Sequence, residues 1–195
     1  VALAYAARYP DRVSHLIASV TSAYTGGFDR PRNWIREHGT EDQIRVAEKL
    51  WEGNFQTEEE LFEYFEVTDP LYTMSWKPDA SKDGLYRGIY SIDAINEGFS
   101  GFLRTFDIRD ELKNITAPTL VIGGRHDWIL PVDLSVELAG LIPNAELRIF
   151  EESGHSVLYD ETEKLFDVIR GFLVYNNSGS ACRNPRATPL PQHGS

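Results

Sequence analysis

Apolar residues recur at helical spacing in some parts of this chain and in short continuous runs in others. Residues 1–9 are alanine-rich with a helical spacing of apolar positions, and Pro10 ends the expected helix. The run at 15–20 is short, largely apolar and partly β-branched, which is typical of a buried strand in a parallel sheet. Residues 1–28 therefore predict a helix followed by a core strand.

Residues 29–105 have a different character, because they are mostly helical in pattern and rich in aromatic and acidic residues. Thr40 and Thr57 each precede a Gln or Glu by three residues, the form of a capping box at a helix start. Each opens an amphipathic run, namely Ile44, Ala47, Leu50 and Trp51 in the first and Leu61, Phe62, Tyr64 and Phe65 in the second. We interpret residues 29–105 as a helical insertion.

The strand pattern resumes in residues 106–175. A strand ending in a glycine turn is expected at 118–124, a helix at 132–141 and another strand at 146–150. The last helix begins near Asp160 and carries Leu165, Val168, Ile169 and Phe172 on one face. Strands that alternate with helices predict an α/β fold with a parallel sheet. Only three core strands are expected, and such a small sheet with an open flank is a poor candidate for independent folding.

Residues 176–195 have no periodicity and are dominated by proline, glycine and small polar residues, so we expect a disordered tail. Cys182, the single cysteine, lies there, which argues against disulfides and a cysteine metal site. The net charge of −11 argues against nucleic acid or an anionic membrane surface as a partner. No apolar run reaches the length of a membrane span and no signal peptide is visible, so a cytoplasmic location is expected.

Three local patterns, in this order, resemble the α/β-hydrolase fold. They are Ala-Ala-Arg-Tyr-Pro-Asp-Arg-Val ahead of the first strand, Pro-Thr-Leu-Val-Ile-Gly-Gly-Arg-His-Asp ending at 127, and Ser-Gly-His ending at 155 before the last helix. The resemblance covers residues 1–174 and makes the helical insertion a cap. It implies a serine hydrolase without a cofactor, in which a serine attacks an acyl carbon, a histidine moves the proton and an acid orients the histidine.

The resemblance implies that Asp127 is the catalytic acid and His155 the catalytic base. His126, beside the acid, is interpreted as an ordinary loop side chain. A metal site is not expected, because no carboxylates or cysteines cluster in the sequence with the three remaining histidines, His15, His38 and His193.

The sequence contains no Gly-x-Ser-x-Gly motif for the nucleophile. Phe99-Ser100-Gly101 is only superficially similar and lies in the insertion, so we reject Ser100. In this fold the nucleophile precedes the acid and the histidine in the chain. We therefore expect the serine and the oxyanion hole ahead of Val1, and we expect the chain on its own to be an inactive C-terminal portion of the enzyme.

Within the fold, the closest resemblance is to proline iminopeptidases, which remove N-terminal residues from short peptides. It rests on the acidic cap and on Ile-Asn-Glu-Gly-Phe at 95–99, and it implies that Glu97 binds the free amino group of the substrate. A carboxylate suits that task, because a desolvated ammonium needs a paired negative charge. Trp128 departs from the pattern, since some related aminopeptidases carry a glutamate there. A tryptophan makes the predicted substrate pocket more apolar.

Three functions therefore stay open. The first is a serine aminopeptidase of the iminopeptidase type, with a short peptide as its partner. The second keeps the triad but acts as an esterase, lactonase or amidase on a small apolar acyl compound, which Trp128 would suit. The third is a truncated product that binds or scaffolds without catalysis.

Overall fold

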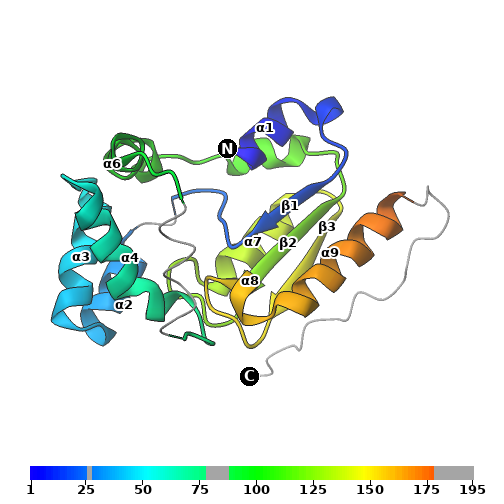
Figure 1. Cartoon of the computed structure of the whole chain (residues 1–195). Coiled ribbons are helices and arrows are strands. Elements are labelled where there is room, and N and C mark those ends of the chain that lie inside the picture. The colour runs from blue at the N-terminus through cyan, green and yellow to red at the C-terminus, as the bar shows by residue number, and fades with distance from the viewer. Residues whose placement is uncertain (26–27, 78–87, 178–195) are drawn as a thin grey trace, which may run out of the picture.

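The computed structural model describes residues 1–25, 28–77 and 88–177. These residues form two parts that lie side by side in Figure 1. The sheet region comprises residues 1–25 and 106–177 and contains all the strands of the described chain. The helical layer comprises residues 28–77 and 88–105.

Three parallel strands form the sheet, in the order β1-β2-β3. They are β1 (Leu16–Ser19), β2 (Thr119–Gly124) and β3 (Ala145–Phe150), and Leu120 lies opposite Ile17 on one side and Glu146 on the other. The central strand β2 is buried at every position, whereas β1 lies at an edge and leaves Ile17 37% exposed. The predicted α/β class with a parallel sheet is confirmed.

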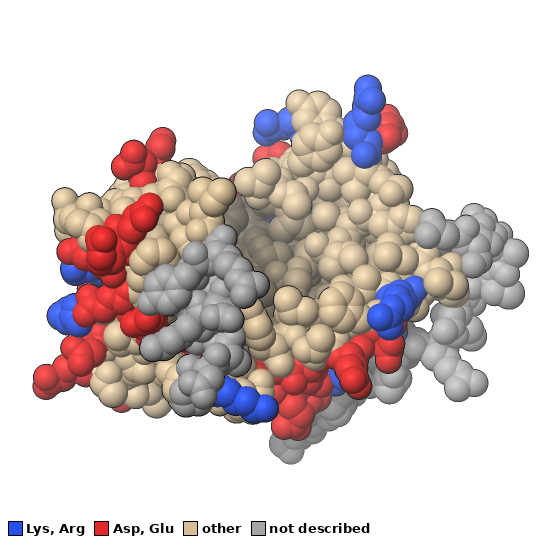
Figure 2. Space-filling view, viewed as in Figure 1, with Lys and Arg blue, Asp and Glu red and all other residues tan. Residues whose placement is uncertain are grey.

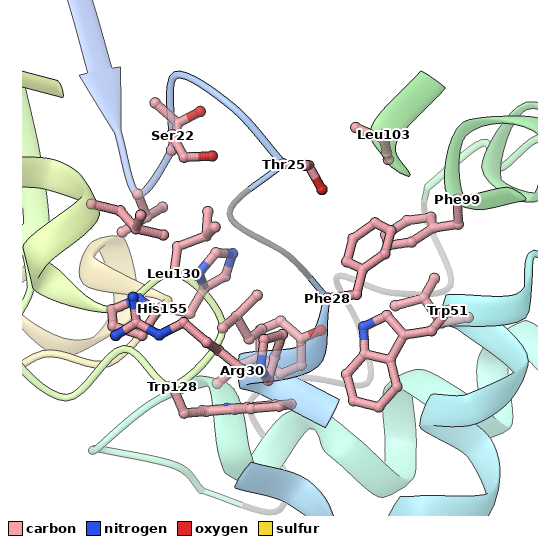
Figure 3. Close-up of a pocket in the computed structure, with 18 of the residues that line it drawn as sticks. Ser22, Thr25, Phe28, Arg30, Trp51, Phe99, Leu103, Trp128, Leu130 and His155 are labelled. Carbon is pink, nitrogen blue, oxygen red and sulfur yellow. The ribbon is translucent and has the colours of Figure 1, made fainter. Parts of the chain in front are cut away.

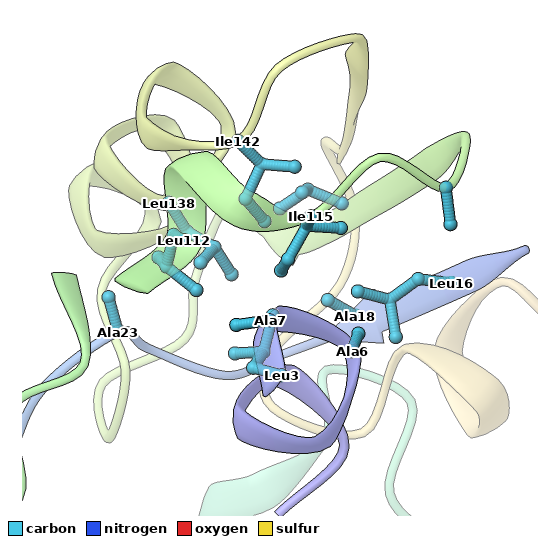
Figure 4. Close-up of a cluster of buried hydrophobic side chains, with 12 residues drawn as sticks. Leu3, Ala6, Ala7, Leu16, Ala18, Ala23, Leu112, Ile115, Leu138 and Ile142 are labelled. Atoms are coloured by element: carbon cyan, nitrogen blue, oxygen red, sulfur yellow. The ribbon is translucent and has the colours of Figure 1, made fainter. Parts of the chain in front are cut away.

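Helices cover both faces of the sheet. On one face lie α1 (Ala2–Arg8), the short helix η3 (Arg109–Asn114) and α7 (Val132–Leu141), with η1 (Pro10–Arg12) following α1. Their apolar cluster, drawn in Figure 4, includes Leu3, Ala6, Ala7, Leu16, Ala18, Ala23, Leu112, Ile115, Leu138 and Ile142. Val121 of β2 belongs to this cluster, so its neighbours Leu120 and Ile122 face the opposite side, where they pack with residues of α8 and α9.

The opposite face is covered by α8 (Val157–Asp160) and α9 (Thr162–Asn177). Leu165 and Phe172 of α9 are buried there with Phe150 of β3. α9 continues to Asn177, so the first two residues of the predicted tail, 176 and 177, are helical. The rest of the predicted tail, residues 178–195, lies outside the described residues.

The helical layer contains α2 (Asp29–His38), α3 (Glu41–Glu52), α4 (Glu58–Tyr72), α6 (Ile92–Ser100) and the short helix η2 (Phe102–Arg104). The capping box predicted at Thr40 is complete, with both reciprocal bonds to Gln43. The capping box predicted at Thr57 forms only in part. The Thr57 hydroxyl accepts from the Glu60 N–H, but the Glu60 carboxylate accepts from the N–H of Gln56 instead of closing the box.

Aromatic side chains fill the interior of the helical layer. Its buried cluster contains Ile35, Val46, Ala47, Trp51, Phe55, Leu61, Tyr64 and Trp128. Trp128 comes from the sheet region, so this cluster also fastens the two parts together. On the face shown in Figure 2, Asp and Glu side chains gather over the helical layer, and a hollow separates it from the sheet region. In the described part of the chain, no helix is both long and apolar enough to cross a membrane.

Candidate active site

Two loops at the carboxyl ends of β2 and β3 form one side of the candidate site. Because the two strands are parallel neighbours, the loops that follow them emerge at the same edge of the sheet. The N–H of Arg125 donates to the carbonyl of Phe150, and the N–H of His126 donates to the carbonyl of Ser153, each at 2.9 Å. A Cβ atom at Gly124 would lie 2.0 Å from the carbonyl oxygen of Gly154, so this close approach requires glycine.

The loops bring Asp127 and His155 together. Nδ1 of His155 lies 2.8 Å from Oδ2 of Asp127, whose side chain is fully buried. The other carboxylate oxygen accepts the N–H groups of Ile129 and Leu130, each at 2.9 Å. An ionised carboxylate only accepts hydrogen bonds, so Nδ1 must carry the proton and a neutral His155 keeps Nε2 as an acceptor. The pair can therefore take up a proton at Nε2.

A cavity of about 300 Å³ lies between these loops and the helical layer. Figure 3 shows His155 on one side and Phe28, Trp51 and Phe99 of the helical layer on the other. Most of the other lining side chains are apolar or aromatic, among them Val20, Leu50, Tyr64, Tyr72, Leu103, Phe106, Trp128, Ile129, Leu130 and Leu134. Such a mostly apolar cavity with a few polar groups is the usual form of a small-molecule site.

In the described lining of this cavity, Arg30 is the only side chain of the Asp, Glu, Lys and Arg types. Its guanidinium donates to both carboxylate oxygens of Asp133, at 2.8 and 3.0 Å. The hydrogen bond raises the pKa of Arg30, and the same bond lowers the pKa of Asp133. No carboxylate belongs to the described lining of the cavity, and the charge of Arg30 is already paired.

Trp128 is 7% exposed and lines the cavity beside the acid loop. Its indole N–H donates to the carbonyl of Leu71 at 2.8 Å, and its ring stacks on Trp34 with centroids 4.8 Å apart. The ring also meets Trp51 and Tyr72 edge to face. The position fits the predicted apolar pocket, and a contact with substrate stays a prediction.

The structure does not bring Glu97 to the cavity. Glu97 is exposed on α6 and is absent from the cavity lining. The adjacent Asn96 faces inward, because its side chain donates to the carbonyl and accepts from the N–H of Phe55 at 2.8 and 3.0 Å. Consecutive residues on a helix point in different directions, so an inward Asn96 turns Glu97 away. The predicted amine-binding role of Glu97 stays a prediction without support from this geometry.

Ser100, rejected as a nucleophile, donates its hydroxyl to the carbonyl of Asn96 at 2.6 Å within its own helix. His126 is exposed, as expected for a loop side chain. Among the residues that the structure describes, no group of three or more His, Cys, Asp or Glu side chains could hold a metal ion.

Two tyrosines of α4 were missed by the sequence interpretation. Tyr64 and Tyr72 both line the cavity, and their hydroxyls are hydrogen-bonded to each other. The ring of Tyr72 meets the ring of His155 edge to face, with centroids 5.5 Å apart. The amphipathic pattern marked Tyr64 as an inward position, but nothing local showed that the end of α4 reaches the histidine loop.

Val20, at the end of β1, also lines the cavity and has a φ of +42°. This left-handed conformation is strained for a β-branched residue, and such strain concentrates at functional sites. The turn leads to Thr21 and Ser22, which line the same cavity.

Comparison with known proteins places this geometry in a family. The model of the alpha/beta hydrolase fold matches residues 1–162. Proline iminopeptidase PfmaB of Pestalotiopsis fici is 29% identical over 173 residues, which cover 87% of this chain and 61% of the relative. A 2-hydroxy-6-oxononadienedioate/2-hydroxy-6-oxononatrienedioate hydrolase of Paraburkholderia phymatum is 28% identical over 179 residues, covering 88% and 58%.

A solved structure shows the same fold. It is an alpha/beta fold family hydrolase from Bacillus anthracis, with a TM-score of 0.66 and 22% identity, over 88% of this chain and 62% of that one. The chain thus spans about three fifths of the length of the relatives it matches. The family match, the parallel sheet and the two loops at its edge agree, and the chain belongs to the α/β hydrolase fold family.

Proposed function

We propose that the complete protein hydrolyses an ester or amide bond of a small, uncharged and largely apolar acyl compound. His155 acts as the general base and Asp127 holds its ring. The nucleophile is a serine ahead of Val1. The observation that carries the proposal is the 2.8 Å bond between His155 and the buried Asp127 at the wall of an aromatic cavity.

The chemistry follows from the proton positions. The serine oxygen forms a bond to the acyl carbon while its proton moves to Nε2 of His155. The resulting imidazolium is stabilised by Asp127, which keeps its negative charge. His155 then returns the proton to the departing alcohol or amine as the acyl–heteroatom bond breaks. Water repeats the sequence and releases the acid, which restores the free serine.

The cavity supports an uncharged substrate. An ammonium group removed from water requires a paired negative charge, and the described lining contains no carboxylate. The single arginine there is already paired with Asp133 in a bidentate ion pair. Aromatic and aliphatic side chains dominate the remaining surface, so burial of apolar groups supplies most of the binding free energy.

A second candidate is an aminopeptidase of the proline iminopeptidase type, which removes N-terminal residues from short peptides. It is favoured by the likeness to PfmaB across most of the chain. In that case a carboxylate must reach the substrate amine, and Glu97 is the candidate that the sequence offers. The two functions therefore differ in whether a free amino group is needed.

The test compares three chromogenic substrates on the complete protein: prolyl-p-nitroanilide, its N-acetylated form and p-nitrophenyl butyrate. We expect hydrolysis of the ester, and we expect N-acetylation not to lower kcat/KM for the anilide. A loss of activity on acetylation would replace the first candidate with the aminopeptidase. Failure to hydrolyse any of the three, together with no covalent labelling by a fluorophosphonate, would contradict both.

A further inference from the structure

The hydroxyl groups of Tyr64 and Tyr72 form a polar pair inside an otherwise apolar part of the cavity. Both side chains project from α4, eight residues apart, and their hydroxyls are hydrogen-bonded to each other. Tyr64 is only 4% exposed and Tyr72 is half-buried. Phe55 packs edge to face on the ring of Tyr64, and Trp128 does so on the ring of Tyr72. The pair is thus enclosed by aromatic rings but borders the cavity.

Counting hydrogens shows that the pair has a donor to spare. Two phenols carry two hydroxyl hydrogens, and their mutual bond uses one of them. When Tyr64 donates to Tyr72, the second hydrogen is that of the Tyr72 hydroxyl, for which the described residues show no acceptor. The Thr68 hydroxyl, which donates to the backbone carbonyl of Tyr64, is a hydrogen-bond partner of the Tyr64 side chain and not of Tyr72. A buried donor without an acceptor is unfavourable, so an acceptor entering the cavity gains a hydrogen bond there.

Tyr72 is fixed in relation to the catalytic pair by backbone contacts. Its carbonyl accepts the N–H of Ser156, the residue after His155, at 2.8 Å. The carbonyl of Leu71 accepts the indole N–H of Trp128, the residue after Asp127, at 2.8 Å. The end of α4 is therefore bonded to both catalytic loops. A donor held in this way is preorganised and loses little entropy when it binds a substrate.

The hydroxyls are protonated donors at neutral pH. Burial raises the pKa of Tyr64, and burial together with the nearby Tyr64 and Asp127 raises the pKa of Tyr72 well above its usual value. A neutral donor of this kind prefers a carbonyl, ether or hydroxyl oxygen and gives no pairing to a cation.

We propose that the Tyr64–Tyr72 hydroxyl pair is a subsite for a second oxygen of the substrate, so that the preferred substrate is an apolar acyl compound with a carbonyl or ether oxygen apart from the scissile bond. The inference rests on the proposed hydrolase function and assigns its substrate class. Tyr72 acts as the specificity residue, because its hydroxyl binds a group that does not react.

The test uses two aryl esters that differ in one carbonyl group, p-nitrophenyl pentanoate and p-nitrophenyl 4-oxopentanoate. A buried neutral hydrogen bond predicts that the complete wild-type protein prefers the keto ester about tenfold in kcat/KM. Tyr72→Phe should abolish that preference through a higher KM for the keto ester, whereas Tyr64→Phe leaves the Tyr72 donor in place and should keep the preference. Tyr90→Phe, which removes a hydroxyl from the same layer outside the cavity lining, should keep the ratio of the wild type.

A binding measurement separates failure of the subsite from failure of the hydrolase function. Titration with 4-phenylbutan-2-one, followed by tryptophan fluorescence, should show weaker binding to Tyr72→Phe than to the wild type or to Tyr64→Phe. Turnover of the esters with the same ratio in all variants would overturn the subsite and leave the function standing. Binding that depends on the Tyr72 hydroxyl, without turnover of either ester, would overturn the hydrolase function and leave the subsite standing. Circular dichroism of each variant checks that it is folded.

Discussion

The sheet region and the helical layer contribute to the site in different ways. The sheet region positions Asp127 and His155 through short loops whose backbones are hydrogen-bonded to each other. The helical layer instead supplies a wall of aromatic side chains that pack on one another and on Trp128. Backbone geometry thus fixes the two proposed proton-transfer groups, while side-chain packing shapes the surface that would contact the rest of a substrate.

The two regions meet at the end of α4. The carbonyls of Leu71 and Tyr72 accept hydrogen bonds from Trp128 and Ser156, beside the acid and the histidine. Asp160 adds a third connection, because its carboxylate binds both the loop after α4 and the N–H of Gly154. A change in the helical layer can therefore reach the loops of Asp127 and His155 through these bonds and through the packing of Trp128.

The largest expected effect comes from the sheet region. His155→Ala in the complete protein removes the proton acceptor, and we expect kcat for the best substrate to fall about 10⁴-fold. Asp127→Asn should cause a similar loss, because an amide can hold the ring in the wrong tautomer. Initial rates with p-nitrophenyl butyrate measure both effects.

His126→Ala is the matched control, since this exposed histidine lies in the same loop as Asp127. Its kcat should stay within about threefold of the wild type, as is usual for a surface change away from the reacting atoms. If His155→Ala kept most of its turnover while His126→Ala lost it, the assignment of the base would be wrong.

The next largest effect is expected on stability, when a buried leucine of either region is truncated. Leu138 is fully buried against the sheet and Leu61 is fully buried in the helical layer. Truncation of either to Ala should lower the free energy of unfolding by about 2–5 kcal/mol. Trp34, Trp51 and Trp128 lie in or against the helical-layer cluster, so tryptophan fluorescence reports mainly on that layer and far-UV circular dichroism on the whole molecule.

The two variants should differ in whether the fluorescence and dichroism midpoints shift by the same amount. Loss of the sheet removes the loop that carries Trp128, so Leu138→Ala should shift both denaturation midpoints together. Leu61→Ala should shift the fluorescence midpoint further than the dichroism midpoint, because the sheet has its own apolar clusters. Coincident midpoints for both variants would show that the two regions unfold as one unit.

The sequence predicted the sheet region well because its signals are local. The apolar run at 118–124 and the helix at 132–141 correspond closely to β2 and α7. Gly124 permits the close contact between the two loops, whereas the pairing of Asp127 with His155 was expected from the family resemblance alone. The start of α3 was also readable, because a capping box is formed by residues three apart.

The helical layer was less predictable, because its role in the site depends on contacts between distant segments. An aromatic residue at helical spacing signals an inward position but not whether it faces a core or a cavity, as Tyr64 shows. Glu97 illustrates the opposite case. Its motif suggested a substrate contact, yet the inward packing of Asn96 against Phe55 orients the helix differently.

A smaller effect is expected at the connection between the regions. Asp160 accepts from the N–H of Gly154 at 2.8 Å, from the N–H and hydroxyl of Ser75 at 2.9 Å each, and from the hydroxyl of Thr73. Asp160→Asn weakens this set, and we expect a loss of about 2 kcal/mol in the free energy of unfolding at pH 7. Urea denaturation measures it, with Asp167→Asn on the exposed face of α9 as the control.

The pH dependence has a definite sign. Burial alone raises the pKa of Asp160, but the hydrogen bonds from Thr73, Ser75 and Gly154 outweigh it and leave the pKa below its usual value. A lowered folded-state pKa stabilises the protein above the unfolded-state value of about 3.9, and the stabilisation disappears as pH falls through the folded-state pKa. The difference between wild type and Asp160→Asn should therefore shrink below about pH 4. A constant difference from pH 7 to pH 3 would contradict this account.

The smallest effect is expected for the ion pair between Arg30 of α2 and Asp133 of α7, which joins the two regions at the cavity. Both side chains are about half exposed, at 48% and 60%, so water screens their attraction. A double-mutant cycle with Arg30→Gln and Asp133→Asn should give a coupling energy of less than about 1 kcal/mol, and 1 M NaCl should reduce it further. The exposed pair Arg170–Asp167 within α9 is the reference for an ion pair that joins no regions. A coupling above about 2 kcal/mol would mean that charge pairing, rather than the aromatic contacts of Trp128, holds the helical layer against the sheet.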